Sequence, residues 1–298
     1  MVELGGPPIR QWYNNRNSFM PGTLFVVATP IGNLEDVTAR ALRILREVTL
    51  IAAEDTRRTA HLLARYAITT PSTSLHEHNE AKKTSSLLTR LARGDNLALV
   101  SDAGTPTISD PGQRLIRSAI DAGFRVESVP GPSAILTALA ASGLPTETFT
   151  FLGFPPTNAG TRTRWLTDLA SARRTVIFFE APHRLRETLD EIRSVIGDCP
   201  VLIAGELTKI HEKLVRGPIS RVLELLESPR GEFTVVVDVG QTTEYAAAKL
   251  VSDSDLLIEL GETTVRNGLS RRRAISLIAR RHRLTPNQVY AAIERAKK

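Results

Sequence analysis

The chain has 298 residues, of which 42% are hydrophobic and 23% charged, and its formal net charge is +6. This composition is typical of a soluble globular protein that is long enough for more than one domain. No apolar stretch is long enough to cross a membrane and no apolar signal region begins the chain, so we expect a cytoplasmic protein, and the single cysteine, Cys199, excludes a disulfide within one chain.

The first half of the chain predicts an N-terminal α/β domain. Residues 1–21 are rich in Gly, Pro and Asn without periodicity and predict a disordered extension. In residues 22–130 apolar runs alternate with helical patterns, and Asp36 is the expected N-cap of the first helix. The expected strands are 23–28, 48–53, 97–100 and 124–129, and the expected helices include 34–48, 85–92 and 113–122. This alternation predicts a parallel sheet covered on both faces.

The second half predicts another α/β domain over residues 131–240. The Pro130-Gly131-Pro132-Ser133 stretch is the best domain boundary in the chain, and Ser133 is expected to cap a helix at 134–141. Further strands are expected at 149–156 (with its loop), 175–179, 201–204 and 232–239, and further helices at 161–170, 185–195 and 219–226.

Residues 241–298 predict a basic helical module beyond a polar linker at 241–244. One amphipathic helix follows Ser270 and another begins at Thr285-Pro286, which suggests a helix-turn-helix-like arrangement. Ten Lys and Arg side chains lie between Thr264 and Lys298 against the single acidic residue Glu294. Such a charge favours a polyanionic partner, with nucleic acid first, and the alternative is a packing or dimerisation arm.

Several polar loops follow expected strands, and the most informative is Val100-Ser-Asp-Ala-Gly-Thr-Pro-Thr-Ile-Ser-Asp-Pro-Gly112. A strand, a Gly/Pro-rich loop and a helix form the place where an open α/β sheet binds its ligand. The other such loops are 30–33, 54–58, 180–184 and 206–209. The chain has neither G-x-G-x-x-G nor a Walker lysine loop, which argues against a dinucleotide or a triphosphate as the ligand.

Five motifs stand in a fixed order along the chain: Ala28-Thr-Pro-Ile-Gly-Asn33, Glu54-Asp-Thr-Arg-Arg58, Ser101-Asp-Ala-Gly-Thr-Pro106, Gly131-Pro-Ser-Ala134 and Glu206-Leu-Thr-Lys209. Together they resemble the tetrapyrrole-methylase superfamily and, more narrowly, its ribosomal small-subunit methyltransferase I branch, from about residue 23 to 240. The resemblance implies a two-domain α/β homodimer that binds S-adenosylmethionine in the cleft between its domains. It also implies methylation of the ribose 2′-oxygen of a cytidine in the decoding region of 16S ribosomal RNA.

The resemblance also implies a set of site residues. Those expected around the methyl donor are Pro30, Asp102, Ala103, Gly104, Thr105, Ile108, Ser133, Ala134, Phe179, Leu207 and Glu232. Candidates for a general base, which could add about 10²–10⁴-fold to the rate, are Glu180, His183 and Lys209. A helix N-cap is the alternative role of Glu180, and a surface position on a helix that of His183.

Further residues are expected to face RNA. Arg57 and Arg58 follow Asp55 at a strand end and suit a phosphate, with a plain helix surface as the alternative. His76 and His78 are spaced like metal ligands, but no third ligand stands nearby, so we expect no metal and assign them to an RNA-facing wall. The basic C-terminal candidates are Arg271, Arg272 and Arg273.

Two other functions compete with methylation of RNA. A methylase of corrin or porphyrin precursors would share the fold, but a small substrate needs neither the basic C-terminus nor the polar stretches at 54–58 and 76–79. A non-enzymatic RNA-binding protein with a vestigial pocket is the other alternative, and the intact loop at 102–106 argues against it.

Overall fold

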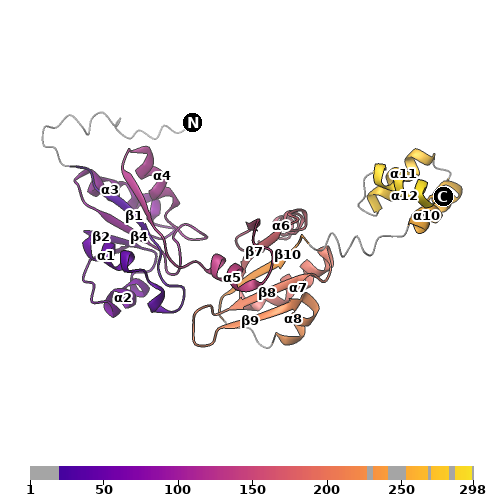
Figure 1. The fold of residues 1–298 in the computed structure, drawn as a ribbon. Helices are drawn as coiled ribbons and strands as arrows, with labels where there is room; N and C mark the ends of the chain where they lie inside the picture. Colours follow the sequence, from indigo (N-terminus) through magenta and orange to yellow (C-terminus); the bar gives the residue numbers. More distant parts are fainter. Residues whose placement is uncertain (1–19, 227–230, 241–252, 268–269, 282–285, 297–298) are drawn as a thin grey trace. The chain divides into compact units, whose positions relative to one another are not determined.

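The computed structural model describes residues 20–226, 231–240, 253–267, 270–281 and 286–296. The chain divides after Gly240 into two compact units. The first unit contains two lobes, each built on a five-stranded sheet (Figure 1). Among the described residues, no helix has the length and apolar character that a bilayer crossing requires.

The sheet of the N-terminal lobe is entirely parallel, with strand order β3-β2-β4-β1-β5. Its strands are β1 (Thr23–Val27), β2 (Leu50–Ala53), β3 (Ser72–Ser74), β4 (Leu97–Val100) and β5 (Arg125–Val129). Helices α1 (Ala39–Glu47) and α2 (Thr56–Arg65) share one hydrophobic core with the sheet, and α3 (Glu80–Ala92) and α4 (Gln113–Asp121) share another. The predicted parallel sheet with two covered faces is confirmed.

The connections that follow the neighbouring strands β1 and β4 run to opposite faces of this sheet. The chain leaves β1 toward α1, which packs in one core, and leaves β4 toward α4, which packs in the other. A crevice forms outside the carboxyl ends of two such strands because their connections diverge. The loops at 28–38 and 101–112 therefore border a natural ligand position.

Two local predictions in this lobe were wrong. The expected helix at 34–48 is a 3₁₀ turn, Leu34–Asp36, followed by α1. Thr38, not Asp36, caps α1, because its Oγ1 accepts the Ala41 amide at 3.1 Å while Asp36 lies inside the preceding turn. The edge strand β3 was not expected, because its three residues, Ser-Thr-Ser, are polar and show no apolar pattern.

The C-terminal lobe has a mixed sheet with strand order β6-β7-β10-β8-β9. Strands β6 (Phe149–Phe151) and β7 (Thr175–Glu180) are parallel, and antiparallel pairs join β7, β10 (Phe233–Asp238), β8 (Pro200–Gly205) and β9 (Lys213–Pro218). Helix α5 (Ala134–Ser142) covers one face, and the other face is covered by α6 (Ala159–Ser171), α7 (Pro182–Ile196) and α8 (Ile219–Leu225). Ser133 caps α5 as predicted, since its Oγ accepts the Leu136 amide.

The polar loops of this lobe meet at one edge for a reason other than a parallel sheet. Both β7 and β8 run antiparallel to β10, so their carboxyl ends point the same way, and the amino end of β10 lies between them. Phe233 pairs with Glu180 on one side and with Gly205 on the other. Glu232 therefore reaches this edge from the start of a strand. Strand β9 was not predicted.

The only cysteine lies in the core of the C-terminal lobe. Cys199 immediately precedes β8 and is 1% exposed. Burial raises the pKa of its thiol to about 12. The thiol is therefore protonated and inert in the folded lobe.

The second unit is a helical bundle with its own core. Helices α10 (Asp253–Asn267), α11 (Arg271–Arg281) and α12 (Pro286–Ala296) bury Leu256, Ala274, Ile278, Val289 and Ile293 against one another. Helix α10 was not expected, so the module has three described helices where sequence indicated two. Residues 1–19, the expected linker at 241–244, and Thr285 lie outside the described residues.

Candidate functional site

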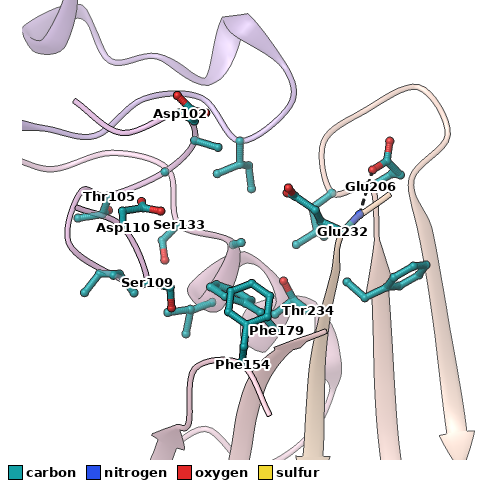
Figure 2. Close-up of a pocket in the computed structure, with 18 of the residues that line it drawn as sticks. Asp102, Thr105, Ser109, Asp110, Ser133, Phe154, Phe179, Glu206, Glu232 and Thr234 are labelled. Carbon is teal, nitrogen blue, oxygen red and sulfur yellow. Dashed lines mark hydrogen bonds between the residues drawn. The ribbon is translucent and has the colours of Figure 1, made fainter. Parts of the chain in front are cut away.

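A cavity of about 350 Å³ lies between the two lobes of the first unit (Figure 2). Its walls come from the loops that follow β1, β2, β4, β6 and β8, from the end of β7, and from the starts of α2, α5 and β10. This volume is in the range of small-molecule sites. Its lining includes Ile31, Glu54, Arg58, Asp102–Thr105, Ile108–Asp110, Ser133–Ile135, Phe154, Phe179, Glu180, Glu206, Leu207, Lys209 and Glu232–Thr234.

Backbone hydrogen bonds hold the N-terminal wall of the cavity in place. The Thr29 amide donates to the Gly104 carbonyl at 2.9 Å, and the Gly104 amide donates back to the Thr29 carbonyl at 3.0 Å. Gly104 has a φ of +80°, which favours glycine, and a Cβ there would lie 3.4 Å from Ile31 Cγ2. The Thr105 hydroxyl donates to the Pro132 carbonyl at 3.3 Å. This loop is thus tied to the β1 loop and to the connection between the lobes.

The two lobes also touch beside the cavity. The Asn33 amide donates to Thr208 Oγ1 at 2.9 Å. A Cβ on Gly32 would come within 2.6 Å of the Leu207 carbonyl oxygen, so only glycine fits this approach. The glycine of the Thr-Pro-Ile-Gly-Asn motif therefore serves the contact between lobes.

Three neighbouring carboxylates, Glu54, Asp102 and Asp110, line the N-terminal side of the cavity. Asp102 Oδ1 accepts the Asp55 amide at 2.9 Å, and Glu54 Oε2 accepts the Asp102 amide at 3.2 Å. Burial raises the pKa of Glu54, and the charge of Asp102 raises it further. Burial and then the charges of neighbouring carboxylates, Glu54 first, raise the pKa of Asp110 to about 6. Mutual repulsion of this kind makes the wall attractive to a cation.

Strained backbone is concentrated in two of the loops that border the cavity. Among the described residues other than glycine, positive φ occurs at six positions, of which four lie in the loops after β4 and β8. These four are Thr107 (75°), Ser109 (66°), Glu206 (50°) and Thr208 (64°). Such conformations cost about 1–3 kcal/mol each and cluster at functional sites.

The three candidate bases occupy different environments. The carboxylate of Glu180 is fully buried, and its Oε1 and Oε2 accept the Ala181 amide at 2.8 Å and Thr188 Oγ1 at 2.6 Å. Lys209 lines the cavity and its Nζ pairs with Glu206 Oε1 at 2.9 Å. His183 is exposed on α7 and is absent from the lining residues.

The residues expected around a methyl donor converge on this cavity with one exception. Pro30 is buried and does not line the cavity, whereas its neighbour Ile31 does. Sequence reasoning missed Glu54 and Asp110 as lining residues, although both stand in motifs that it singled out. It also missed Phe154, for which the sequence offers no signal beyond a position shortly after an apolar run.

The expected RNA-facing residues are not gathered in one place. Arg58 lines the cavity with its Nε 3.5 Å from Asp102 Oδ2, and its side chain is 65% exposed. Arg57 folds back onto Asp55, with Nη2 2.7 Å from Oδ2, and this contact lowers the pKa of Asp55. His76 and His78 are exposed and lie outside the lining. No metal-binding group of three His, Cys, Asp or Glu side chains occurs among the residues that the structure describes.

The C-terminal arginines lie at the start of α11. Arg271, Arg272 and Arg273 are exposed. Arg271 Nη2 donates to Glu294 Oε1 at 2.6 Å, and its guanidinium lies 5.7 Å from the centre of the Tyr290 ring. One of the three is therefore engaged with α12.

Comparison with known proteins places the chain in a family. The family described as Tetrapyrrole (Corrin/Porphyrin) Methylases matches residues 23–223. The Ribosomal RNA small subunit methyltransferase I of Xylella fastidiosa is 49% identical over 222 residues, which cover 73% of this chain and 81% of that protein. The Synechocystis protein of the same name is 43% identical over 272 residues, covering 90% of this chain and 96% of that protein.

Solved structures share the fold at low sequence identity. A uroporphyrin-III C-methyltransferase from Thermus thermophilus, complexed with S-adenyl homocysteine, is 20% identical with a TM-score of 0.53, over 73% of this chain and 98% of that one. A diphthine synthase is 12% identical with a TM-score of 0.57, over 72% of this chain and 90% of that one. The chain therefore belongs to the tetrapyrrole methylase family, in the branch of the ribosomal RNA small subunit methyltransferases I.

Proposed function

We propose that this protein uses S-adenosylmethionine to methylate the ribose 2′-oxygen of a cytidine in the decoding region of 16S ribosomal RNA. The observation that carries the proposal is the cavity between the lobes, at the point where the connections of β1 and β4 diverge, in a chain whose relatives are named for ribosomal RNA methylation. The proposal includes a cytoplasmic homodimer that acts on the small ribosomal subunit or its RNA, as the sequence resemblance implies.

The residues around the cavity fit this methyl donor. Its sulfonium and amine carry positive charge, and the wall presents Asp102, Asp110 and Glu232. Its adenine and ribose need apolar walls and backbone groups, which Ile31, Leu207 and the segment 102–105 offer. A volume of about 350 Å³ suits a molecule of this size.

Placement of the reacting groups is the main contribution that we assign to the chain. The bound donor supplies an already activated methyl group for in-line attack by the ribose oxygen. The loop tied by Thr29 and Gly104 holds the donor side rigidly. Such alignment can lower a barrier by about 7–11 kcal/mol.

The candidate bases take different parts in this proposal. Both carboxylate oxygens of Glu180 already accept hydrogen bonds inside the protein, so we assign it a positioning role. Lys209, paired with Glu206 on the cavity wall, is suited to an RNA phosphate. His183 lies outside the lining, and we assign it no step.

The test is direct transfer of labelled methyl groups. Purified protein with labelled S-adenosylmethionine is offered small ribosomal subunits, naked 16S RNA and uroporphyrinogen III in parallel. We expect label in RNA alone, mapped by resistance to alkaline cleavage at one cytidine. Label in the tetrapyrrole, or in an RNA base instead of the ribose, would overturn the proposal.

We assign the basic C-terminal unit to RNA binding. It has its own core, so a chain ending at Gly240 should still bind the methyl donor. Each lost phosphate contact should reduce the slope of log affinity against log salt by about 0.7–0.9. An unaltered slope, with dissociation into monomers on gel filtration, would show instead that the unit serves assembly.

A further inference from the structure

One aromatic ring stands exposed at the wall of the cavity. Phe154 follows β6 and is 53% exposed, although it lines the cavity (Figure 2). Its ring centre lies 5.4 Å from that of Phe179, which in turn lies 4.9 Å from that of Phe151. Leaving a large apolar ring in water forgoes the free energy of its burial. The exposed face of Phe154 is therefore available to another flat molecule.

Hydrogen bonds to backbone carbonyls hold the loop that carries Phe154. The carbonyls of Leu152 and Gly153 accept Trp165 Nε1 at 3.3 Å and the Phe179 amide at 2.9 Å. Arg184 Nη2 donates to the Pro155 carbonyl at 2.7 Å and to the Pro156 carbonyl at 3.2 Å. Two consecutive prolines restrict the backbone further. The loop therefore holds the ring rigidly. Because folding already orders this loop, binding a ligand to the ring carries little further entropic cost.

Buried ionic groups hold this support. Arg162, 9% exposed, donates through Nη1 to the Pro156 carbonyl at 3.2 Å and through Nε to Glu191 at 2.7 Å. Its Nη2 donates to Thr188 Oγ1 at 2.8 Å, and that hydroxyl donates to Glu180 at 2.6 Å. Burying charges of this kind yields little net stability and is better explained by the fixed geometry that it imposes.

Two cations line the same cavity as the ring, Arg58 from the start of α2 and Lys209 from the loop after β8. Their side chains are 65% and 41% exposed. An aromatic platform beside cations is the usual way in which proteins hold an unpaired nucleotide, with the base on the ring and the phosphate on the cations. A ribose oxygen can enter a cavity of this size only when its nucleotide is drawn out of a stack, which leaves its base in need of a new partner.

We propose that Phe154 is the platform on which the base of the target nucleotide stacks, and that Arg162, Arg184 and Glu180 are positioning residues that fix this platform. The proposal rests on the proposed function and names the part of the site that receives RNA. The competing occupant of the ring is the adenine of the methyl donor, and the test separates the two.

The experiment compares Phe154→Ala, Phe154→Leu and Phe154→Trp with Phe149→Ala. Phe149 is a matched control, since it is 39% exposed in the same lobe but outside the cavity lining. We expect Phe154→Ala to lower kcat/KM for RNA about 5- to 100-fold, Phe154→Trp to restore it and Phe154→Leu to fail, because stacking requires a flat ring. Calorimetric affinity for S-adenosylhomocysteine should stay within about twofold of the wild type.

Two results would overturn the proposal. A fall in S-adenosylhomocysteine affinity with unchanged RNA affinity would assign the ring to the donor, and full rescue by leucine would reduce it to an apolar contact.

A binding readout keeps this inference separate from the proposed function. The fluorescence of Phe154→Trp should be quenched by a decoding-region oligoribonucleotide with cytidine at the target position, and much less by the same strand with an abasic site there. If this quenching occurs but the wild-type protein methylates no RNA, the proposed methylation activity is wrong, and the assignment of Phe154 as the stacking platform is retained. If methylation occurs and the two strands quench equally, the platform is wrong and the activity stands.

Discussion

Both lobes bring carboxylates to the cavity, but the N-terminal lobe adds tightly bonded backbone, whereas the C-terminal lobe adds aromatic rings and a buried ion-pair network. The first side is built by Gly104, Asp102 and Asp110, and the second by Phe154 and Phe179 (Figure 2). A small cation requires fixed charges at short range, while an extended polymer requires a surface that is open to it. In our proposal the fixed loop of the N-terminal lobe holds the donor, with Leu207 and Glu232 of the other lobe completing its pocket, and the exposed ring of the C-terminal lobe receives the RNA base.

The lobes also differ in how their sheets deliver residues to the cavity. In the N-terminal lobe every strand is parallel, and all loops at the carboxyl edge follow a strand. In the C-terminal lobe the central strand β10 runs the other way, so Glu232 and Phe233 arrive from its amino end. The direction of each strand therefore decides which end of it contributes residues to the cavity, in a parallel sheet and in a mixed sheet alike.

The largest expected effect comes from filling the N-terminal wall. Gly104→Val should abolish S-adenosylmethionine binding, more than 100-fold by calorimetry, because its φ is positive and its side chain would enter space beside Ile31. Gly123→Val is the matched control, since Gly123 has a φ of +78° with no atom within 4 Å of its Cβ position. Equal losses in both variants would show that backbone strain, not occupation of the cavity, is responsible.

An intermediate effect is expected from the charge on the N-terminal wall. Asp110→Asn should weaken donor binding about tenfold, and wild-type affinity should itself decline as pH falls through about 6, where the Asp110 carboxylate becomes protonated. Asp121→Asn is the control, because Asp121 is exposed on α4 and paired with Arg117. A pH-independent affinity between 5 and 8 would contradict the role of this charge.

The same substitution should stabilise the protein without ligand. The folded-state pKa of Asp110 lies above its ordinary value of 3.8, so its stabilising contribution is complete only below about pH 4 and is lost as pH rises through about 6. After allowance for screening of a partly exposed group, Asp110→Asn should add about 1 kcal/mol at pH 7.5, or about 2–4 °C in Tm. A lower Tm at that pH would contradict the destabilisation of the Asp110 carboxylate by burial and by its neighbouring carboxylates.

The smallest expected effect concerns two neighbouring arginines. Arg58→Ala should weaken RNA binding a few-fold, because Arg58 lines the cavity and is only loosely paired with Asp102. Arg57→Ala should have less effect, because its guanidinium is bound to Asp55, the N-cap of α2. A larger loss for Arg57→Ala in the same filter-binding assay would reverse this order.

Much of the fold was predictable from local patterns. The apolar runs of β1, β2 and β4, and the Ser133 cap of α5, need no tertiary information. Strand β9 and the reversed direction of β10 were missed, because hydrogen bonding between segments decides pairing and direction. The same reason explains β3, whose three polar residues are strand only because they pair with β2.

The candidate site was predictable where a motif carries a backbone requirement. Gly32 and Gly104 stand in motifs because close approach and a positive φ demand glycine. Phe154 was not predictable, because its importance depends on exposure, and exposure follows from the arginines that hold its loop. Glu180 was one of three candidate bases, and its partners Thr188 and Ala181 become visible only in the folded lobe.

Cys199 can serve as a chemical reporter of the transient opening of the C-terminal lobe. It is the only cysteine in the chain and is closed off in the folded C-terminal lobe. An alkylating reagent can therefore react only during transient unfolding, and its rate reports the population of opened molecules. A molecule bound across both lobes reduces that population by mass action. Slower labelling would thus reveal occupancy of the cavity without any measurement of methyl transfer.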